Sequence, residues 1–190
     1  MNKFFVLTSI VLLSLASCNR ELSQTQKEEY ILKGKEIANA TASAMLAEVG
    51  KNMQQGGVGQ TVSFCSEQAE FLTHEMAQKN GVTIKRTSHL IRNEKNKPNA
   101  REQEMISHFL KMKAEAKELK PMVEKNNYGT VQFYAPIMVA QKCTLCHGVL
   151  GETLSVQSDS IIKTVYPKDQ AIGFRENDIR GIWSINFLKK

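Results

Sequence analysis

Two cysteines and a histidine stand together in Cys143-Thr144-Leu145-Cys146-His147, and this spacing indicates a definite chemistry. Thiols so placed add to the two vinyl groups of one porphyrin, and the histidine that follows binds the iron as the proximal ligand. The motif therefore predicts one covalently bound haem c, attached through Cys143 and Cys146, with His147 on the iron. Two alternatives stay open: a thioredoxin-type dithiol, which belongs beside a βαβ pattern, and a Cys2His metal site, which needs a further ligand.

The N-terminal residues have the form of a secretion signal. One positive charge, at Lys3, precedes an apolar run from Phe4 to Ala16 that is too short to cross a bilayer as a helix. The run ends in Leu15-Ala16-Ser17-Cys18, which resembles a bacterial lipobox, so Cys18 is predicted to be acylated and to become the mature N-terminus. An ordinary signal peptide followed by a chance cysteine is the alternative.

These features predict the organisation and the location of the protein. We expect a signal peptide at 1–17, a lipidated N-terminus with a polar tether at 18–28, and a haem-binding domain at 29–190. The lipid is expected to hold the exported domain on a membrane surface, on the periplasmic side or elsewhere in the cell envelope, without spanning the membrane.

The charge of the chain limits the classes of partner that we expect it to bind. The 190 residues include 25 Lys and Arg against 19 Asp and Glu, and the basic residues are spread along the chain rather than clustered. This spread argues against a nucleic-acid partner and favours anionic lipid or an acidic redox or signalling protein. The sequence indicates no catalytic base and no substrate pocket, so we do not expect an enzyme.

The remaining cysteine, Cys65, needs a separate explanation. Oxidising compartments pair or damage free thiols, so Cys65 is predicted to be either an inert buried residue or a thiolate ligand of the iron. No Met, His or Cys follows His147, and a second protein ligand must come from upstream, where the candidates besides the methionines are Cys65, His74, His89 and His108. Cys65 is favoured because it lies on an inward-facing helical stripe, whereas His74 lies half a turn away. Ligation by His89 or His108, or an open site, is the alternative.

Hydrophobic periodicity predicts helices early in the chain and strands late. Helices are expected over 28–51, 58–79 and 100–117, with Gly56-Gly57 separating the first two. Extended segments are expected over 81–91 and 181–188, and a hairpin of 122–125 with 130–134 that turns at Asn126-Asn127. This order predicts an α+β fold with an antiparallel sheet and long N-terminal helices.

Four stretches that span nearly the whole chain after the signal carry a family pattern. They are Val62 to Cys65; Lys85 to Ser88 with Ile91 to Asn93, Asn96 and Pro98; Tyr134 to Ile137 leading into Cys143 to Gly148; and Tyr166 to Gly173 with Asp178, Arg180, Gly181 and the last strand. They resemble single-haem c-type sensor domains, formerly a domain of unknown function, found alone or ahead of bacterial histidine kinases and cyclases. The resemblance implies a PAS-like antiparallel sheet and iron bound by the motif histidine and a cysteine of an early helix, here His147 and Cys65. The family usually has glycine where this chain has Lys85.

Arg86 and Arg92 lie in the second of these stretches. Planar guanidinium groups bind carboxylates through paired hydrogen bonds, so both arginines are predicted to bind the haem propionates. The alternative is solvated surface charge or a structural pair with Asp169 or Asp178.

The predicted function is a low-potential redox or gas sensor with His/Cys axial ligation. A thiolate ligand favours ferric iron, and its bond weakens on reduction or when a diatomic molecule competes for the iron. The alternative is a periplasmic electron-transfer cytochrome c, which keeps both ligands in both oxidation states.

The lipobox gives the first testable prediction. If Cys18 is acylated, the mature protein partitions into the membrane or detergent fraction, because the acyl chains hold it there. Cys18→Ser should release the protein or block its maturation, as followed by fractionation and immunoblotting. Normal cleavage with unchanged membrane retention in Cys18→Ser would place the anchor elsewhere.

Overall fold

The computed structural model of the chain describes residues 21–126 and 128–188. The predicted signal peptide and Cys18 lie outside these residues. The helices are α1 (Gln24–Glu67), α2 (Ala69–Asn80), α3 (Ala100–Ala114), α4 (Thr144–His147) and α5 (Val156–Val165), and the strands are β1 (Val82–Thr87), β2 (Met122–Lys125), β3 (Val131–Met138) and β4 (Ile179–Phe187). The predicted α+β fold is confirmed: the strands form one antiparallel sheet in the order β1-β4-β3-β2.

Helix α1 begins earlier than the sequence pattern predicted. Ser23 is its N-cap, and the Ser23 and Gln26 side chains each accept a hydrogen bond from the other residue's backbone N–H, which forms a capping box. The last part of the predicted tether, from Gln24 onward, is therefore helical. Capping of the first backbone N–H groups extends the helix into residues that have no apolar stripe.

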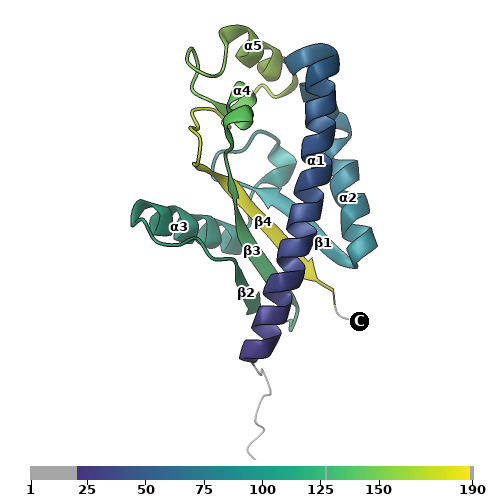
Figure 1. Ribbon diagram of the computed structural model, residues 1–190, viewed down its shortest axis with the longest axis vertical. Coiled ribbons are helices and arrows are strands. Elements are labelled where there is room, and N and C mark those ends of the chain that lie inside the picture. Colours follow the sequence, from purple (N-terminus) through teal and green to yellow (C-terminus); the bar gives the residue numbers. More distant parts are fainter. Residues whose placement is uncertain (1–20, 127, 189–190) are drawn as a thin grey trace, which may run out of the picture.

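A pair of glycines breaks α1, as the sequence predicted, and the chain folds back on itself at this point. Gly56 and Gly57 have non-helical dihedral angles, and the φ of Gly57 is 64°, which favours glycine. Figure 1 shows the chain turning at the top of α1 and returning as α2 alongside it. The returning helix is not continuous over 58–79, because it is broken at Gln68, between α1 and α2. The segment 58–67, which carries Cys65, is thus a short helical arm with a break at each end.

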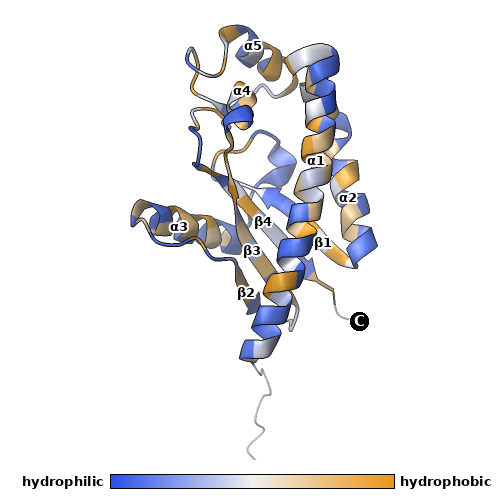
Figure 2. Cartoon of the chain, in the orientation of Figure 1, coloured by the Kyte–Doolittle hydropathy of each residue, from blue (hydrophilic) through white to orange (hydrophobic). Residues whose placement is uncertain are grey.

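The sheet lies between two helices that cover opposite faces. Ile37 of α1 packs with Phe133 and Trp183 on one face, and Phe109 of α3 packs with Tyr134 on the other. The neighbours Phe133 and Tyr134 point to opposite faces because side chains alternate along a strand. Apolar residues are concentrated along β3 and β4, between these helices (Figure 2).

A third apolar cluster lies beyond the sheet, where α4 and α5 meet the turn of α1 at the top of Figure 1. Its buried members are Val62, Leu154 and Ile162, and Cys146 and Tyr166 pack against them. This cluster places the cysteine motif next to the short arm that carries Cys65. Among the described residues, no helix combines the length and the apolar character needed to cross a membrane.

The close approach of α1 to the sheet gives a stability prediction. A Cβ at Gly34 would lie 2.3 Å from the ring of Phe133, so Gly34→Ala should lower the free energy of unfolding by about 1–3 kcal/mol through overpacking. Gly50, in the same helix, has nothing within 4 Å of a Cβ. Gly50→Ala is therefore the control and should raise the free energy of unfolding by roughly 0.5–1 kcal/mol. Urea denaturation of both variants checks this, and equal effects would contradict the packing described.

Candidate cofactor site

The cysteine motif lies on a short helical turn that the surrounding chain holds in place. Cys143 ends a 3-10 turn and Cys146 lies in α4, which ends at Gly148. The Thr144 hydroxyl donates to the Gln141 carbonyl at 2.6 Å and closes this turn. A Cβ on Gly148 would lie 2.4 Å from the Thr144 carbonyl oxygen, so glycine is required for the chain to leave α4.

The ring of His147 is fixed by the main chain of the segment 171–174. Its Nδ1 lies 2.7 Å from the Ala171 carbonyl oxygen, and because a carbonyl only accepts, Nδ1 carries the proton. The backbone N–H of Phe174 also donates to the His147 carbonyl, at 3.0 Å. Burial, followed by the positive charges of Arg180 and Arg92, holds the pKa of His147 well below its usual value. The imidazole is therefore neutral at pH 7, and its Nε2 lone pair is the one suited to a metal.

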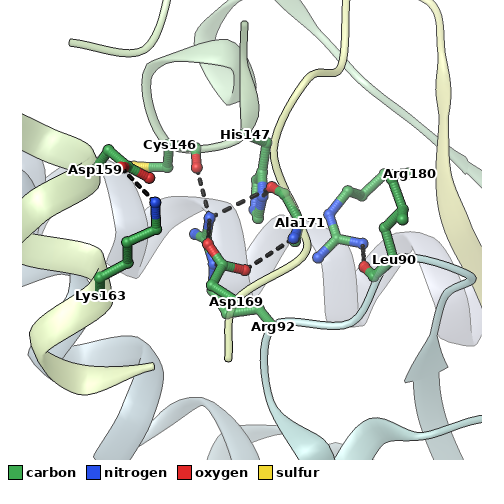
Figure 3. A network of polar contacts seen from close by, with 9 residues as sticks. All are labelled: Leu90, Arg92, Cys146, His147, Asp159, Lys163, Asp169, Ala171 and Arg180. Carbon is green, nitrogen blue, oxygen red and sulfur yellow. Dashed lines mark hydrogen bonds and ion pairs between the residues drawn. The ribbon is translucent and has the colours of Figure 1, made fainter. Parts of the chain in front are cut away.

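A buried ion pair between Arg92 and Asp169 links the main chain next to His147 with the main chain at Ala171. Arg92 Nη2 lies 2.9 Å from Asp169 Oδ2, and Arg92 Nε donates to Asp169 Oδ1 at 3.1 Å. The same Nη2 donates to the carbonyl of Cys146 at 2.6 Å, and Oδ1 of Asp169 accepts from the Ala171 N–H at 2.9 Å (Figure 3). The side chain of Asp169 is 0% exposed. The pair with Asp169, one of the alternatives for Arg92, is thus present, and it occupies Nε and Nη2 of the guanidinium.

Cys65 lies in the same region as Arg86 and Arg92. The Cys65 thiol is half-buried, and its pKa is raised by burial, which the charges of Arg86 and Arg92 partly oppose. Burial, and then Cys65, raises the pKa of Tyr166 to about 12. The pKa of Cys146 is also raised by burial, with Cys65 adding to the effect. The fold therefore places all six predicted cofactor-binding residues in one neighbourhood: Cys65, Arg86, Arg92, Cys143, Cys146 and His147.

The histidines considered as alternative ligands are more exposed than Cys65, although His89 packs against Phe174, which also packs against His147. His74, His89 and His108 are all exposed. His108 is on α3, which covers the face of the sheet opposite α1, and His89 packs its ring edge against Phe174 at a centroid distance of 6.0 Å. Their exposure favours Cys65 over these histidines as the second candidate ligand.

Three observations bear on the two other chemistries considered for the motif. Cys65, Cys143 and Cys146 are all free thiols. The sheet is antiparallel throughout, so the motif lacks the parallel βαβ setting of a thioredoxin-type dithiol. Within residues 21–126 and 128–188, no group of three or more His, Cys, Asp or Glu side chains could hold a metal ion alone.

The structure adds Arg180, at the start of β4, to the predicted residues. Its Nη1 donates to the Leu90 carbonyl at 3.0 Å, and its guanidinium lies over the ring of Phe174, 5.2 Å from the centroid. Its Nε is buried, with no hydrogen-bond partner among the described residues. Burial, and then Arg92, lowers the pKa of Arg180 to about 10. The sequence signal that could have identified Arg180 was an arginine at the start of a buried strand.

The buried histidine gives a pH-dependence prediction for the haem-free protein. Between the usual pKa near 6.5 and the lower folded-state pKa, the unfolded chain binds a proton at His147 that the folded protein does not. Stability from this group is complete above pH 6.5 and is lost as the pH falls through that window. His147→Gln should reduce the slope of the unfolding free energy against pH by up to about 1.4 kcal/mol per pH unit. His74→Gln changes an exposed histidine and is the control, which should leave this slope unchanged. The slopes are measured by urea denaturation at several pH values. Equal slopes for the wild type and His147→Gln would contradict the neutral state of His147 in the folded protein.

Comparisons with known proteins agree with this fold. The profile of the Tll0287-like family matches residues 10–187. A search of curated proteins gave no match. Among solved structures, the chain matches the crystal structure of the cyanobacterial heme-protein Tll0287 with 18% sequence identity and a TM-score of 0.54, over 80% of this chain and 96% of that one. At this identity, the likeness shows a shared fold. Because the family profile spans all of the described elements, the chain belongs to the Tll0287-like family.

Proposed function

We propose that this protein binds one haem covalently through Cys143 and Cys146, with His147 and Cys65 as axial ligands, and acts as a low-potential redox or gas sensor. The observation that carries the proposal is the hydrogen bond between His147 Nδ1 and the Ala171 carbonyl, 2.7 Å long. It fixes the tautomer and orientation of an imidazole whose other nitrogen is suited to iron, directly after two free thiols.

The residues at the site fit a haem. Two thiols are present for thioether bonds, and a neutral imidazole and a third thiol are present for the iron. The apolar cluster of Val62, Leu154 and Ile162 adjoins the motif and supplies a hydrophobic wall. The similar cyanobacterial structure is of a heme protein, which agrees with this assignment. When bound, the haem supplies one-electron chemistry and an iron site that accepts small ligands.

The position of Cys65 favours a sensor over an electron carrier. Cys65 lies on the helical arm 58–67, which is separated from the rest of the helical hairpin by Gly56-Gly57 and by the break at Gln68. Glycine pairs and helix ends are the points at which a helix bends at least cost. A ligand on such an arm is able to leave the iron while the sheet and His147 stay in place. An electron carrier, the second candidate, requires both ligands to remain in both oxidation states.

The protein's location and partner belong to the same proposal. A lipid on Cys18 would hold the domain at a membrane surface of the cell envelope, where a separate redox or signalling protein receives the change at the iron. PAS-like architecture, in the sense of the sensor family, is also part of this proposal.

Covalent attachment is tested by denaturing extraction. Protein matured in a cell with c-type haem machinery should keep its haem in acidified acetone, because thioether bonds survive denaturation. Cys143→Ala/Cys146→Ala should release it. Complete extraction of haem from the wild type would overturn the proposal.

Axial ligation is tested on the same haem-loaded protein. A thiolate stabilises ferric over ferrous iron, so Cys65→Ala should raise the reduction potential by an amount on the order of 100 mV or more. The variant should also lose the thiolate character of the low-spin ferric spectrum and bind added small ligands. His74→Ala, an exposed change on the neighbouring helix α2, is the control and should do neither. Identical potentials and spectra in wild type and Cys65→Ala would refute the Cys65 assignment.

A further inference from the structure

The surroundings of His147 hold more positive than negative charge. Arg92 donates to the carbonyl of Cys146, next to His147, and Arg180 lies over the Phe174 ring, whose centroid is 6.5 Å from that of His147. Arg86 lies near Cys65 and Tyr166. Among the described groups, Asp169 is the carboxylate that acts on Arg180 and pairs with Arg92. Three guanidinium groups thus face one carboxylate, and two positive charges are left without a counter-charge. A partly buried surplus of this size is costly unless an anion joins it.

Asp169 neutralises Arg92 and not the other two arginines. The side chain of Arg92 is 12% exposed and makes two hydrogen bonds with Asp169, and its Nη2 also donates to the Cys146 carbonyl. In Figure 3 the Asp169 carboxylate meets Arg92, while Arg180 reaches the Leu90 carbonyl instead. Arg92 is therefore already paired with a carboxylate through its Nε and Nη2.

Arg180 has a donor with nothing to bind. Its Nε atom is buried and has no hydrogen-bond partner among the described residues. The Leu90 carbonyl and the Phe174 ring are neutral partners and do not balance its charge. Orphaned buried donors are rare in folded proteins, and a guanidinium prefers a carboxylate.

Arg86 is the second arginine without a counter-charge. It lies in β1 next to Lys85, which pairs with Glu102 of α3 at 2.7 Å. Successive strand residues point to opposite faces, so Arg86 faces away from α3, toward the side of Cys65. Burial lowers the pKa of Arg86, and the groups that oppose this are the Cys65 thiol and the Tyr166 phenol. Neither is a carboxylate.

We propose that Arg86 and Arg180 form a binding site for a dicarboxylate anion, the two propionates of a porphyrin, and that Arg92 serves to position His147 and not to bind the anion. The proposal rests on the proposed haem function and replaces Arg92 by Arg180 in the propionate site predicted from the sequence. The two surplus positive charges match the two carboxylates of the porphyrin in number.

The test compares two porphyrins that differ only in their carboxylates. The full chain carrying Cys143→Ala/Cys146→Ala removes the thioether bonds, so that haemin and haemin dimethyl ester each bind reversibly and their Kd values are measured by absorbance titration. The ester should bind roughly tenfold or more weakly, because it lacks the charge-assisted hydrogen bonds. Arg86→Gln and Arg180→Gln should each reduce the ratio of the Kd of the ester to the Kd of haemin, and the double change should bring this ratio near one. Arg175→Gln removes an exposed arginine paired with Glu152 and should leave the ratio unchanged.

Further variants separate the arginines from each other. Arg180→Lys keeps a positive charge, so this variant should still bind the ester more weakly than haemin, although by a smaller factor than the wild-type arginine gives. Arg92→Gln/Asp169→Asn removes the ion pair as a unit and should keep the ratio, while weakening both porphyrins equally. Equal Kd values for haemin and its ester before any arginine is changed would overturn the site and leave the haem function standing. A ratio lost in Arg92→Gln/Asp169→Asn but kept in Arg86→Gln/Arg180→Gln would also overturn it. Failure of both porphyrins to bind would overturn the haem function and the site together.

Discussion

The buried ion pair between Arg92 and Asp169 is the interaction on which the rest of the site depends. It joins the loop after β1, the end of α4 and the segment before β4, three parts of the chain that are far apart in sequence. Asp169 in turn holds the Ala171 N–H, and the Ala171 carbonyl holds the ring of His147. Because Asp169 is fully buried, loss of either partner would strand a charge, which makes the arrangement rigid.

His147 is held more firmly in the structure than Cys65. His147 is fixed by hydrogen bonds to the main chain, whereas Cys65 is carried by a helical arm between two breaks. Under the proposed ligation, Cys65 is therefore the ligand that is more easily displaced from the iron. The apolar cluster around Val62 packs the arm against α5, and Gln60 of the arm donates hydrogen bonds to Asn52 and Gln55 of α1. A firmly held His147 and a more easily displaced Cys65 would suit the ligation-based sensor proposed above.

Much of the scaffold could be predicted because its signals are local. The extended segment expected over 181–188 corresponds to β4, and the glycine pair at Gly56-Gly57 marks a helix break that the structure contains. The start of α1 was predicted too late, since the Ser23 capping box acts without an apolar pattern. Helix α5 was missed, although Ser155 is a good N-cap, because its buried side is short.

The arginines could not be ranked from the sequence, because their roles depend on contacts distant along the chain. The partner of Arg92 lies 77 residues away and that of Arg180 lies 90 residues away. Residue type alone made Arg86 and Arg92 equal candidates, and only the fold distinguishes a neutralised guanidinium from an orphaned one. Tyr166 acquires its place beside Cys65 in the same way, through tertiary packing.

The central claim, that iron is held between His147 and Cys65, is tested most directly by Fe K-edge X-ray absorption on the oxidised, haem-loaded protein. One sulfur scatterer at bonding distance, together with nitrogen scatterers from the porphyrin and one imidazole, is the predicted result. A first shell that contains only nitrogen and oxygen would contradict ligation by Cys65.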